Sequence, residues 1–171
     1  IDILIQYPIT LKSLEGADST IIDGLSLGRI MDIEAEATIR GITFTNGYKT
    51  NDAAGGIAIN STATNSVIDS CRFINNQSPK SSDYFGGAIG SRYAKVTISN
   101  SYFEGNTGRE GGAIGLRSDN GSIITNCVFK SNVSTDSGSA VYIVYNDSDL
   151  DTTRIINSIF INEGKKVIEK E

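Results

Sequence analysis

The sequence predicts an all-β chain folded as a right-handed, single-stranded parallel β-helix (solenoid) of about six turns, with three short strands in each turn. Two short motifs alternate in register along the 171 residues. Isoleucine, with 25 residues, far outnumbers leucine, with 7, and this ratio favours strands. The apolar stretches between turn residues are too short for helices. A period in the twenties with several short strands is typical of a solenoid.

The first motif has the form Ile-x-x-x-x-Phe and is followed by a turn rich in Asn. Five of the six Phe residues fall on it, at gaps of 29, 30, 26 and 31 residues. The copies are Ile39–Phe44, Ile68–Phe73, Ile98–Phe103, Ile124–Phe129 and Ile155–Phe160. Because equivalent residues of successive turns stack in such a coil, we expect the Ile and Phe columns to form two inward apolar stacks.

The second motif, Gly-Gly-Ala-Ile or a close variant, lies between copies of the first. Its copies begin at Gly55, Gly86, Gly111 and Gly138. The same register reaches outward to Arg29–Ile33, to the opening Ile1–Ile5 and to the closing Lys165–Glu169. Gly accepts positive φ freely, so we expect the Gly pairs to make the corner before each strand. In one full turn the predicted strands are Gly111–Leu116, Ser122–Ile124 and Cys127–Lys130.

Two more columns of the repeat are rich in asparagine. Three residues before Phe stand Gly41, Ser70, Asn100, Asn126 and Asn157. Asn tolerates left-handed turn geometry, and stacked amides can bond along a ladder, so we expect this column to be structural. Three residues after Phe stand Asn76, Asn106 and Asn132, which we interpret as turn residues too.

The two cysteines occupy one column of the repeat, two residues before Phe. Ser101 stands between Cys71 and Cys127 in that column, so the two thiols are two rungs apart, or about 9.6 Å. A disulfide needs Cα atoms within about 7 Å. The sequence therefore predicts two free, buried thiols.

Composition excludes several classes of function. The net charge of −5, without basic runs, argues against nucleic acid and anionic membranes as partners. The absence of histidine excludes His-dependent triads. No apolar run reaches the roughly 18 residues of a membrane span. Both ends of the sequence read as strands, so we expect residues 1–171 to be a single β-helix segment of a longer chain.

The paired motifs resemble a known repeat family. Gly-Gly-Ala-Ile at Gly86–Ile89 and Gly111–Ile114, with Phe-x-x-Asn at Phe73–Asn76, resembles the repeats of chlamydial polymorphic outer membrane proteins and the adhesin-like surface proteins of methanogenic archaea. The stretch Ile9–Gly24 is similar to the opening coils of pectin-lyase-like proteins. The resemblance implies a large secreted or cell-surface protein that adheres to cells or matrices.

A pectin-lyase-like enzyme is the main rival interpretation. By resemblance, the lyases use a Lys or Arg base beside calcium held by Asp, and the hydrolases use clustered Asp. Arg92 and Arg117 share one column and could bind a uronate or another carboxylate, or could pair with Asp119 at the surface. Asp147, Asp149 and Asp151 alternate in one loop and could hold calcium, although the full calcium-loop pattern fails and a solvated acidic loop is the simpler interpretation.

Sequons for N-glycosylation lie in predicted turns. They start at Asn60, Asn76, Asn120, Asn132 and Asn146. They are compatible with a glycosylated surface protein, and equally with turns being polar.

We therefore expect a non-enzymatic extracellular or cell-surface scaffold, adhesin-like, with no cofactor. Its partner would be a host or neighbouring cell surface, a glycan or a protein. The longer turns Asn75–Phe85 and Asp147–Thr153 are the first candidates for contact. The alternatives are a polysaccharide lyase or hydrolase domain, and a structural subunit that polymerises through its open ends.

Overall fold

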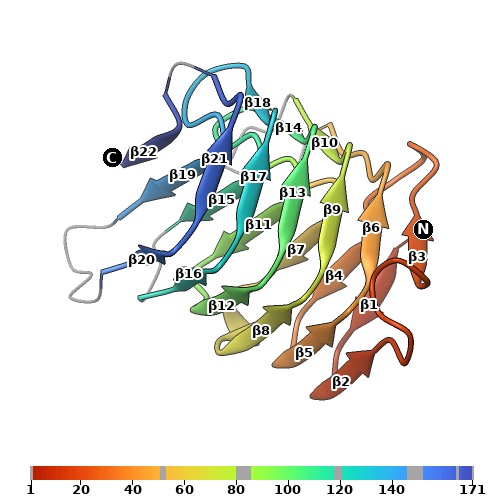
Figure 1. Ribbon diagram of the computed structural model, residues 1–171. Helices are drawn as coiled ribbons and strands as arrows, with labels where there is room; N and C mark the ends of the chain where they lie inside the picture. The colour runs from red at the N-terminus through yellow and green to blue at the C-terminus, as the bar shows by residue number, and fades with distance from the viewer. Residues whose placement is uncertain are drawn as a thin grey trace.

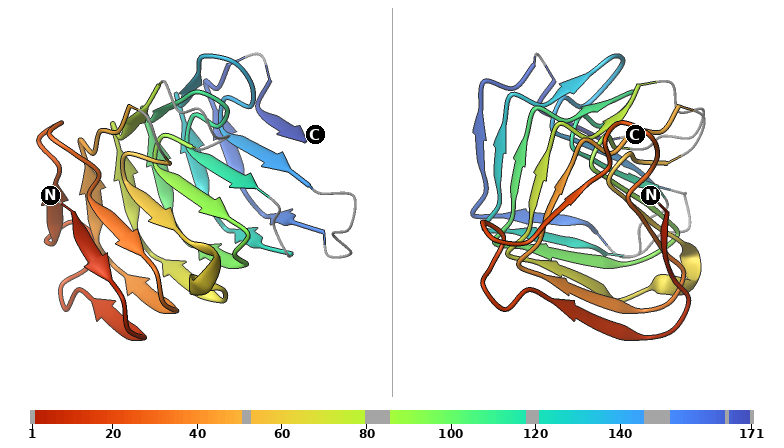
Figure 2. Two further views of the ribbon diagram at one scale, coloured as in Figure 1. Left: turned by 180° about the vertical axis from the view of Figure 1, so that it is seen from behind. Right: turned by 90° about the vertical axis from the view of Figure 1, so that its right-hand side faces the viewer.

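The computed structural model describes residues 2–50, 53–79, 86–117, 121–145, 152–164 and 166–170. The described chain is a parallel β-solenoid of about five turns, as Figure 1 shows from the side. Viewed from the end in Figure 2, the coils superpose on one another. Its helical content is the short 3₁₀ turn η1 (Ser61–Ala63), so these residues contain no helix that could span a membrane. The predicted all-β parallel solenoid is confirmed.

Three sheets form the sides of the coil, and every strand pairs in parallel with its counterpart in the next coil. The seven-stranded sheet contains β1 (Ile3–Ile5), β4 (Met31–Ile33), β7 (Ile57–Ile59), β11 (Ile89–Arg92), β15 (Ile114–Arg117), β19 (Val141–Val144) and β22 (Ile168–Lys170). What we call the Ile sheet contains β2 (Ile9–Lys12), β5 (Ala37–Arg40), β8 (Ser66–Asp69), β12 (Val96–Ser99), β16 (Ile123–Thr125) and β20 (Arg154–Ile156). What we call the Phe sheet contains β3 (Ile21–Asp23), β6 (Thr43–Thr45), β9 (Arg72–Ile74), β13 (Tyr102–Glu104), β17 (Val128–Lys130) and β21 (Ile159–Ile161).

The middle coils also contain a fourth strand, which corrects the prediction of three. These strands are β10 (Gln77–Ser78), β14 (Thr107–Gly108) and β18 (Val133–Ser134), and they form a small parallel sheet of their own. Each has only two residues, which is too short to show the alternation by which a strand is recognised in a sequence.

The core is built from side chains stacked in register, as predicted. Along the Phe sheet, successive rings lie 4.9 to 5.2 Å apart between centroids and within 13° of parallel. The first four of these rings, from Phe44 to Phe129, are fully buried. The inward Ile column of the Ile sheet, from Ile39 to Ile124, is fully buried beside them. Each coil therefore buries its apolar face against its two neighbours.

The two asparagine columns differ from each other. All five residues of the column before Phe have positive φ, between 49° and 65°, which confirms the left-handed turn. The column after Phe, which we interpreted as turn residues, lies inside: Asn76, Asn106 and Asn132 are each 0% exposed and hydrogen-bonded from coil to coil. This is a correction, because the left-handed turn falls on the residue before each of these asparagines (Asn75, Gly105 and Ser131), and the chain points inward directly after it.

The Gly pairs are needed for a reason other than the one expected. Positive φ is found in this motif only at Gly138 among the described residues. A Cβ on Gly87 would lie 2.5 Å from the carbonyl oxygen of Gly112 in the next coil, and one on Gly112 would lie 1.9 Å from that of Ser139. Adjacent backbones therefore approach too closely for any side chain, and this contact, rather than turn geometry, requires glycine.

Candidate functional site

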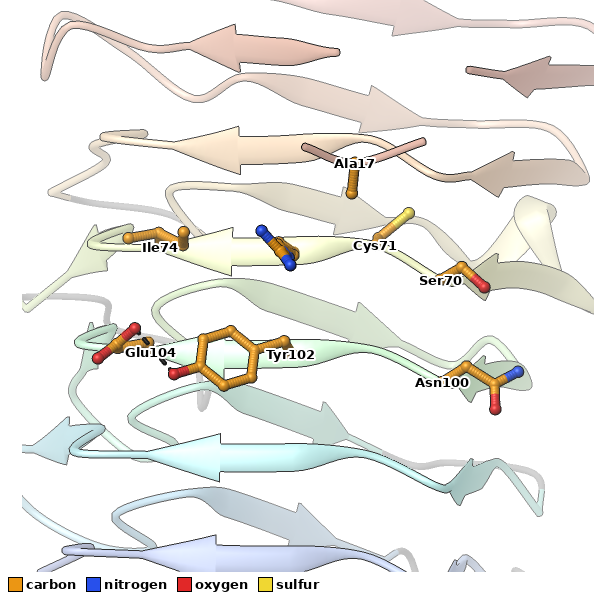
Figure 3. Close-up of a pocket in the computed structure, with 8 residues that line it drawn as sticks. Ala17, Ser70, Cys71, Ile74, Asn100, Tyr102 and Glu104 are labelled. Atoms are coloured by element: carbon orange, nitrogen blue, oxygen red, sulfur yellow. Dashed lines mark hydrogen bonds between the residues drawn. The ribbon is translucent and has the colours of Figure 1, made fainter. Parts of the chain in front are cut away.

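The described surface is hollowed on the outer face of the Phe sheet, where β9 and β13 pair (Figure 3). We call this concavity the tyrosine groove, after Tyr102, whose ring lies along the face of β13 in Figure 3. Its volume is about 570 Å³. It is lined by Ala17, Ser70, Cys71, Arg72, Ile74, Asn100, Tyr102 and Glu104.

Strand alternation explains which side chains reach the groove. Phe73 and Phe103 point into the core, so their neighbours in β9 and β13 point outward. In the register of the sheet, Tyr102 lies beside Arg72, and Glu104 lies beside Ile74. The groove thus offers an aromatic ring, an aliphatic side chain, and one charge of each sign on two neighbouring strands.

A hydrogen-bonded triad fixes the far side of the groove. The Tyr102 hydroxyl donates to Glu104 Oε2 at 2.9 Å, and Lys130 Nζ lies 2.7 Å from Glu104 Oε1. The hydrogen bond from Lys130 lowers the pKa of Glu104, with a further contribution from Tyr102. Burial and the neighbouring carboxylate raise the pKa of Tyr102. At neutral pH the triad is therefore a neutral phenol beside a closed ion pair.

The near side of the groove is closed by residues 13–20, which we call the strap. The Ser13 hydroxyl accepts the Gly16 N–H at 2.9 Å and is bonded to the Thr20 hydroxyl at 2.8 Å, so the strap has a fixed shape. Asp18 forms an ion pair with Arg72, 54 residues away in sequence. The Thr43 hydroxyl also donates to the carbonyl of Ala17. The strap therefore crosses the intervening coil and brings Ala17 beside Ser70 and Cys71 in the groove (Figure 3).

The sequence contained part of the signal for this groove. A residue directly before or after an inward Phe must point outward, so Arg72, Tyr102, Glu104 and Lys130 could have been identified as one outer face. We missed them because their identities do not repeat from coil to coil. The contact between Asp18 and Arg72 left no periodic signal at all.

The predicted arginine column is present in the structure. Arg92 and Arg117 are register partners in β11 and β15, and Val144 follows in β19. The Arg92 guanidinium lies 5.3 Å from the centroid of the Tyr93 ring, a cation–π contact. Asp119, the predicted surface partner, lies outside the described residues.

A second concavity, of about 500 Å³, lies at the outer face of the seven-stranded sheet and includes Arg92. Asp2, Asp32, Glu34 and Asn60 also line it. Arg29, only 5% exposed, supports its wall by donating to the carbonyls of Ala53 and Ala54 and by pairing with Asp32. Arg117 is not among the lining residues, so this concavity takes in only one of the two predicted arginines.

The three aspartates predicted to hold calcium follow β19 in the sequence. Asp147, Asp149 and Asp151 lie outside the described residues. Within the described ranges, no group of three or more Cys, Asp or Glu side chains is arranged to hold a metal ion.

The five sequons differ in where the structure places them. Asn60 is exposed at the start of η1, and its side chain makes no capping hydrogen bond. Asn76 and Asn132 are 0% exposed, and both amide nitrogens donate two hydrogen bonds inside the coil. These two side chains are not accessible to a glycan in the folded chain. Asn120 and Asn146 lie outside the described residues.

The two cysteines are free and buried, as predicted. Burial raises the pKa of each thiol to about 11. A thiol that is protonated at neutral pH and lies in the core is a poor nucleophile and a poor metal ligand. Although Cys71 lies at the edge of the tyrosine groove, it adds no reactive group there.

Comparison with models of protein families, with curated proteins and with solved structures gives no match to this chain. The function is therefore inferred from the geometry of the coil and of its outer faces.

Proposed function

We propose that this chain is a non-enzymatic, extracellular or cell-surface scaffold of the adhesin type, wound as a right-handed helix of about six turns. One observation carries the proposal. The inward columns repeat from coil to coil, whereas the outward residues change, so a rigid rod presents a varied surface. A solenoid that recognises a ligand needs a constant core for stability and a variable outer face for specific contacts.

The tyrosine groove is the contact surface that we favour, and a glycan is the ligand. A half-buried Tyr102 ring provides an apolar platform, and amide, hydroxyl and charged groups surround it. Ligand sites combine an apolar surface with a few placed polar groups in this way. Aromatic rings with a polar tip suit such mixed contacts.

The ionisable groups of the groove argue against catalysis there. General acid–base chemistry at neutral pH needs a group whose pKa lies near 7. The pKa of Glu104 is lowered by Lys130, and the pKa of Tyr102 is raised by burial, so each moves away from neutrality. A polysaccharide lyase or hydrolase activity is therefore the second candidate, and calcium-dependent cleavage is its distinguishing result.

The test is a binding screen on a glycan array that includes acidic polysaccharides, with and without calcium, in which each bound glycan is then examined for chain cleavage. Conservative substitutions can be taken from residues that occupy the same register position in neighbouring coils. Thr43 and Val128 occupy the same column as Arg72 and Tyr102, so Arg72→Thr with Tyr102→Val alters the groove and keeps residues that the sheet already accepts. Arg92→Val with Arg117→Val is the matched control, because Val144 continues that column.

We expect binding without cleavage, and at least a tenfold weaker affinity in the groove variant only. Loss of binding in the arginine variant alone would move the site to β11 and β15. Cleavage of any polymer would contradict the non-enzymatic scaffold and favour a polysaccharide lyase or hydrolase. If no glycan binds and electron micrographs show filaments, the self-associating structural subunit would be favoured.

A further inference from the structure

The buried asparagine column forms a continuous hydrogen-bonded ladder with a repeated rule. From Asn106 onward, each side-chain oxygen accepts two N–H groups from the coil before it, as Asn106 Oδ1 accepts the backbone N–H and Nδ2 of Asn76 at 3.0 and 3.1 Å. Asn76 Oδ1 begins the ladder by accepting the backbone N–H of Gly47 at 2.9 Å. The second hydrogen of each amide points back to a Phe carbonyl. These contacts run from Asn76 to Phe44, from Asn106 to Phe73 and from Asn132 to Phe103, at 2.9 to 3.1 Å.

Glu163 takes the next position of this ladder, three residues after Phe160. Its Oε1 accepts the backbone N–H of Asn132 at 3.2 Å and the Nδ2 of Asn132 at 3.1 Å, as an asparagine oxygen would. Its Oε2 is buried and has no hydrogen-bond partner among the described residues. By the rule of the ladder, the acceptor for this rung is the carbonyl of Phe129, which pairs in register with Phe160.

A carboxylate cannot follow the ladder's rule, because it has no hydrogen to donate. A buried oxygen that carries negative charge without a donor is strongly disfavoured. A protonated carboxyl group has one O–H donor and one carbonyl acceptor, which is the pattern that an asparagine amide presents to its neighbours. The neutral acid therefore fits the position that the anion does not.

The electrostatic surroundings agree with this geometry. Burial raises the pKa of Glu163, and it outweighs the two hydrogen bonds from Asn132 that lower it. The charged side chains on the neighbouring elements are engaged with other partners: Lys130 with Glu104, Asp136 with Arg109, and Lys166 with Glu169. The shift of the Glu163 pKa comes from burial and from the two hydrogen bonds with Asn132.

We propose that Glu163 is a protonatable rung of the ladder: as a neutral acid it donates from Oε2 to the carbonyl of Phe129 and fastens the last described coil, and its ionisation loosens that coil. The device is a pH-sensitive contact between β18, the turn before it and the coil of β21. It is independent of the proposed function, since no residue of the tyrosine groove or of the arginine column takes part.

The direction of the pH effect follows from the raised pKa. Between the unfolded value of about 4.5 and the folded value, the closed coil binds more protons than the open coil. The contribution of Glu163 is fully present below pH 4.5 and is lost as the pH rises through its folded pKa. Within that window the equilibrium constant for opening rises by up to tenfold for each pH unit.

The first experiment measures the titration directly. The side-chain carboxyl ¹³C shift of Glu163 gives its pKa, and hydrogen exchange of the Asn132 backbone amide reports whether the rung is closed. We expect a pKa above 4.5, and a protection factor at Asn132 that falls as Glu163 ionises while that of Asn76 stays constant. A pKa at or below 4.5 would overturn the proposal.

The second experiment replaces the acid by an amide. Glu163→Gln supplies a permanent N–H donor, so we expect the protection at Asn132 to lose its pH dependence. Glu169→Gln in β22 is the matched control, because Lys166 lowers the pKa of Glu169 and its linkage has the opposite sign. If Glu163→Gln keeps the wild-type pH profile, the rung is not the titrating group. If that variant does not fold, the titration of the unaltered chain decides.

Discussion

Two columns of the coil contain asparagine at the same distance from phenylalanine, one three residues before the ring and the other three residues after it. The column after Phe is completely buried, and its amides connect coil to coil. The column before Phe is largely exposed, and one amide contact between its members, from Asn126 to Asn100, is long at 3.4 Å. Only the outer column has positive φ throughout.

The difference shows that asparagine is selected for two unrelated properties. In the outer column its backbone matters, because Asn tolerates the left-handed region better than other residues with a Cβ. In the inner column its side chain matters, because an amide has both a donor and an acceptor and can satisfy buried groups on two sides. Substitutions that retain one property and remove the other therefore separate the columns.

The largest effect is expected for Asn106→Ala in the inner column. This change leaves two N–H donors of Asn76 and the carbonyl of Phe73 without their partner inside the core. Each unsatisfied buried group costs about 1–3 kcal/mol, so we expect the free energy of unfolding to fall by about 4 kcal/mol. Urea denaturation measures it. A loss below about 1 kcal/mol would mean that water replaces the ladder.

A smaller effect is expected for Asn126→Ala in the outer column. Its φ of 54° is costly for alanine, and its side-chain contact is exposed and long. We expect a loss of about 1 kcal/mol from backbone strain. Asn126→Gly is the control, since glycine adopts this conformation without strain. If the glycine variant is as unstable as the alanine variant, the amide rather than the backbone is what this position needs.

The smallest effect is expected for Ser70→Asn, which extends the outer column. Ser70 has a φ of 54° without being Gly or Asn, and it stands where later coils have Asn100 and Asn126. We expect this variant to gain about 0.5 kcal/mol in the free energy of unfolding, because Asn adopts left-handed geometry at lower cost. A thermal melt shows the gain as a small rise in Tm. A lower Tm would show that the hydroxyl of Ser70 outweighs its backbone strain.

Much of the fold could be predicted because it repeats. The spacing of Phe44, Phe73 and Phe103 was sufficient to place the stacked core, and the column of Cys71 and Cys127 was sufficient to exclude a disulfide. The sequence did not show which way the chain points after the turn at Asn75, so the burial of Asn76 was missed. It also did not show that coils approach so closely at Gly87 and Gly112.

The candidate site was harder to predict because it depends on what does not repeat. Arg92 and Arg117 were found as a column because both coils carry arginine. Tyr102 and Arg72 were not, because each is the single residue of its kind in its column. The ion pair of Asp18 with Arg72 joins residues that are 54 positions apart and do not occupy equivalent positions of the repeat. The candidate site therefore consists of residues that depart from the repeat, and periodicity does not identify such residues.

The pairing of each strand with its counterpart in the next coil also determines how the molecule responds to tension. Hydrogen bonds between parallel neighbours point along the axis of the coil, so a force along this axis loads the interfaces between coils in series, and we expect the weakest interface to open first. Each coil that peels away, at roughly 27 residues and about 3.4 Å per residue, adds roughly 90 Å of extended chain. The ion pair of Asp18 with Arg72 joins the first coil to the third, so the strap adds one more contact across this end of the coil. We therefore expect the coil to lengthen in stages under load.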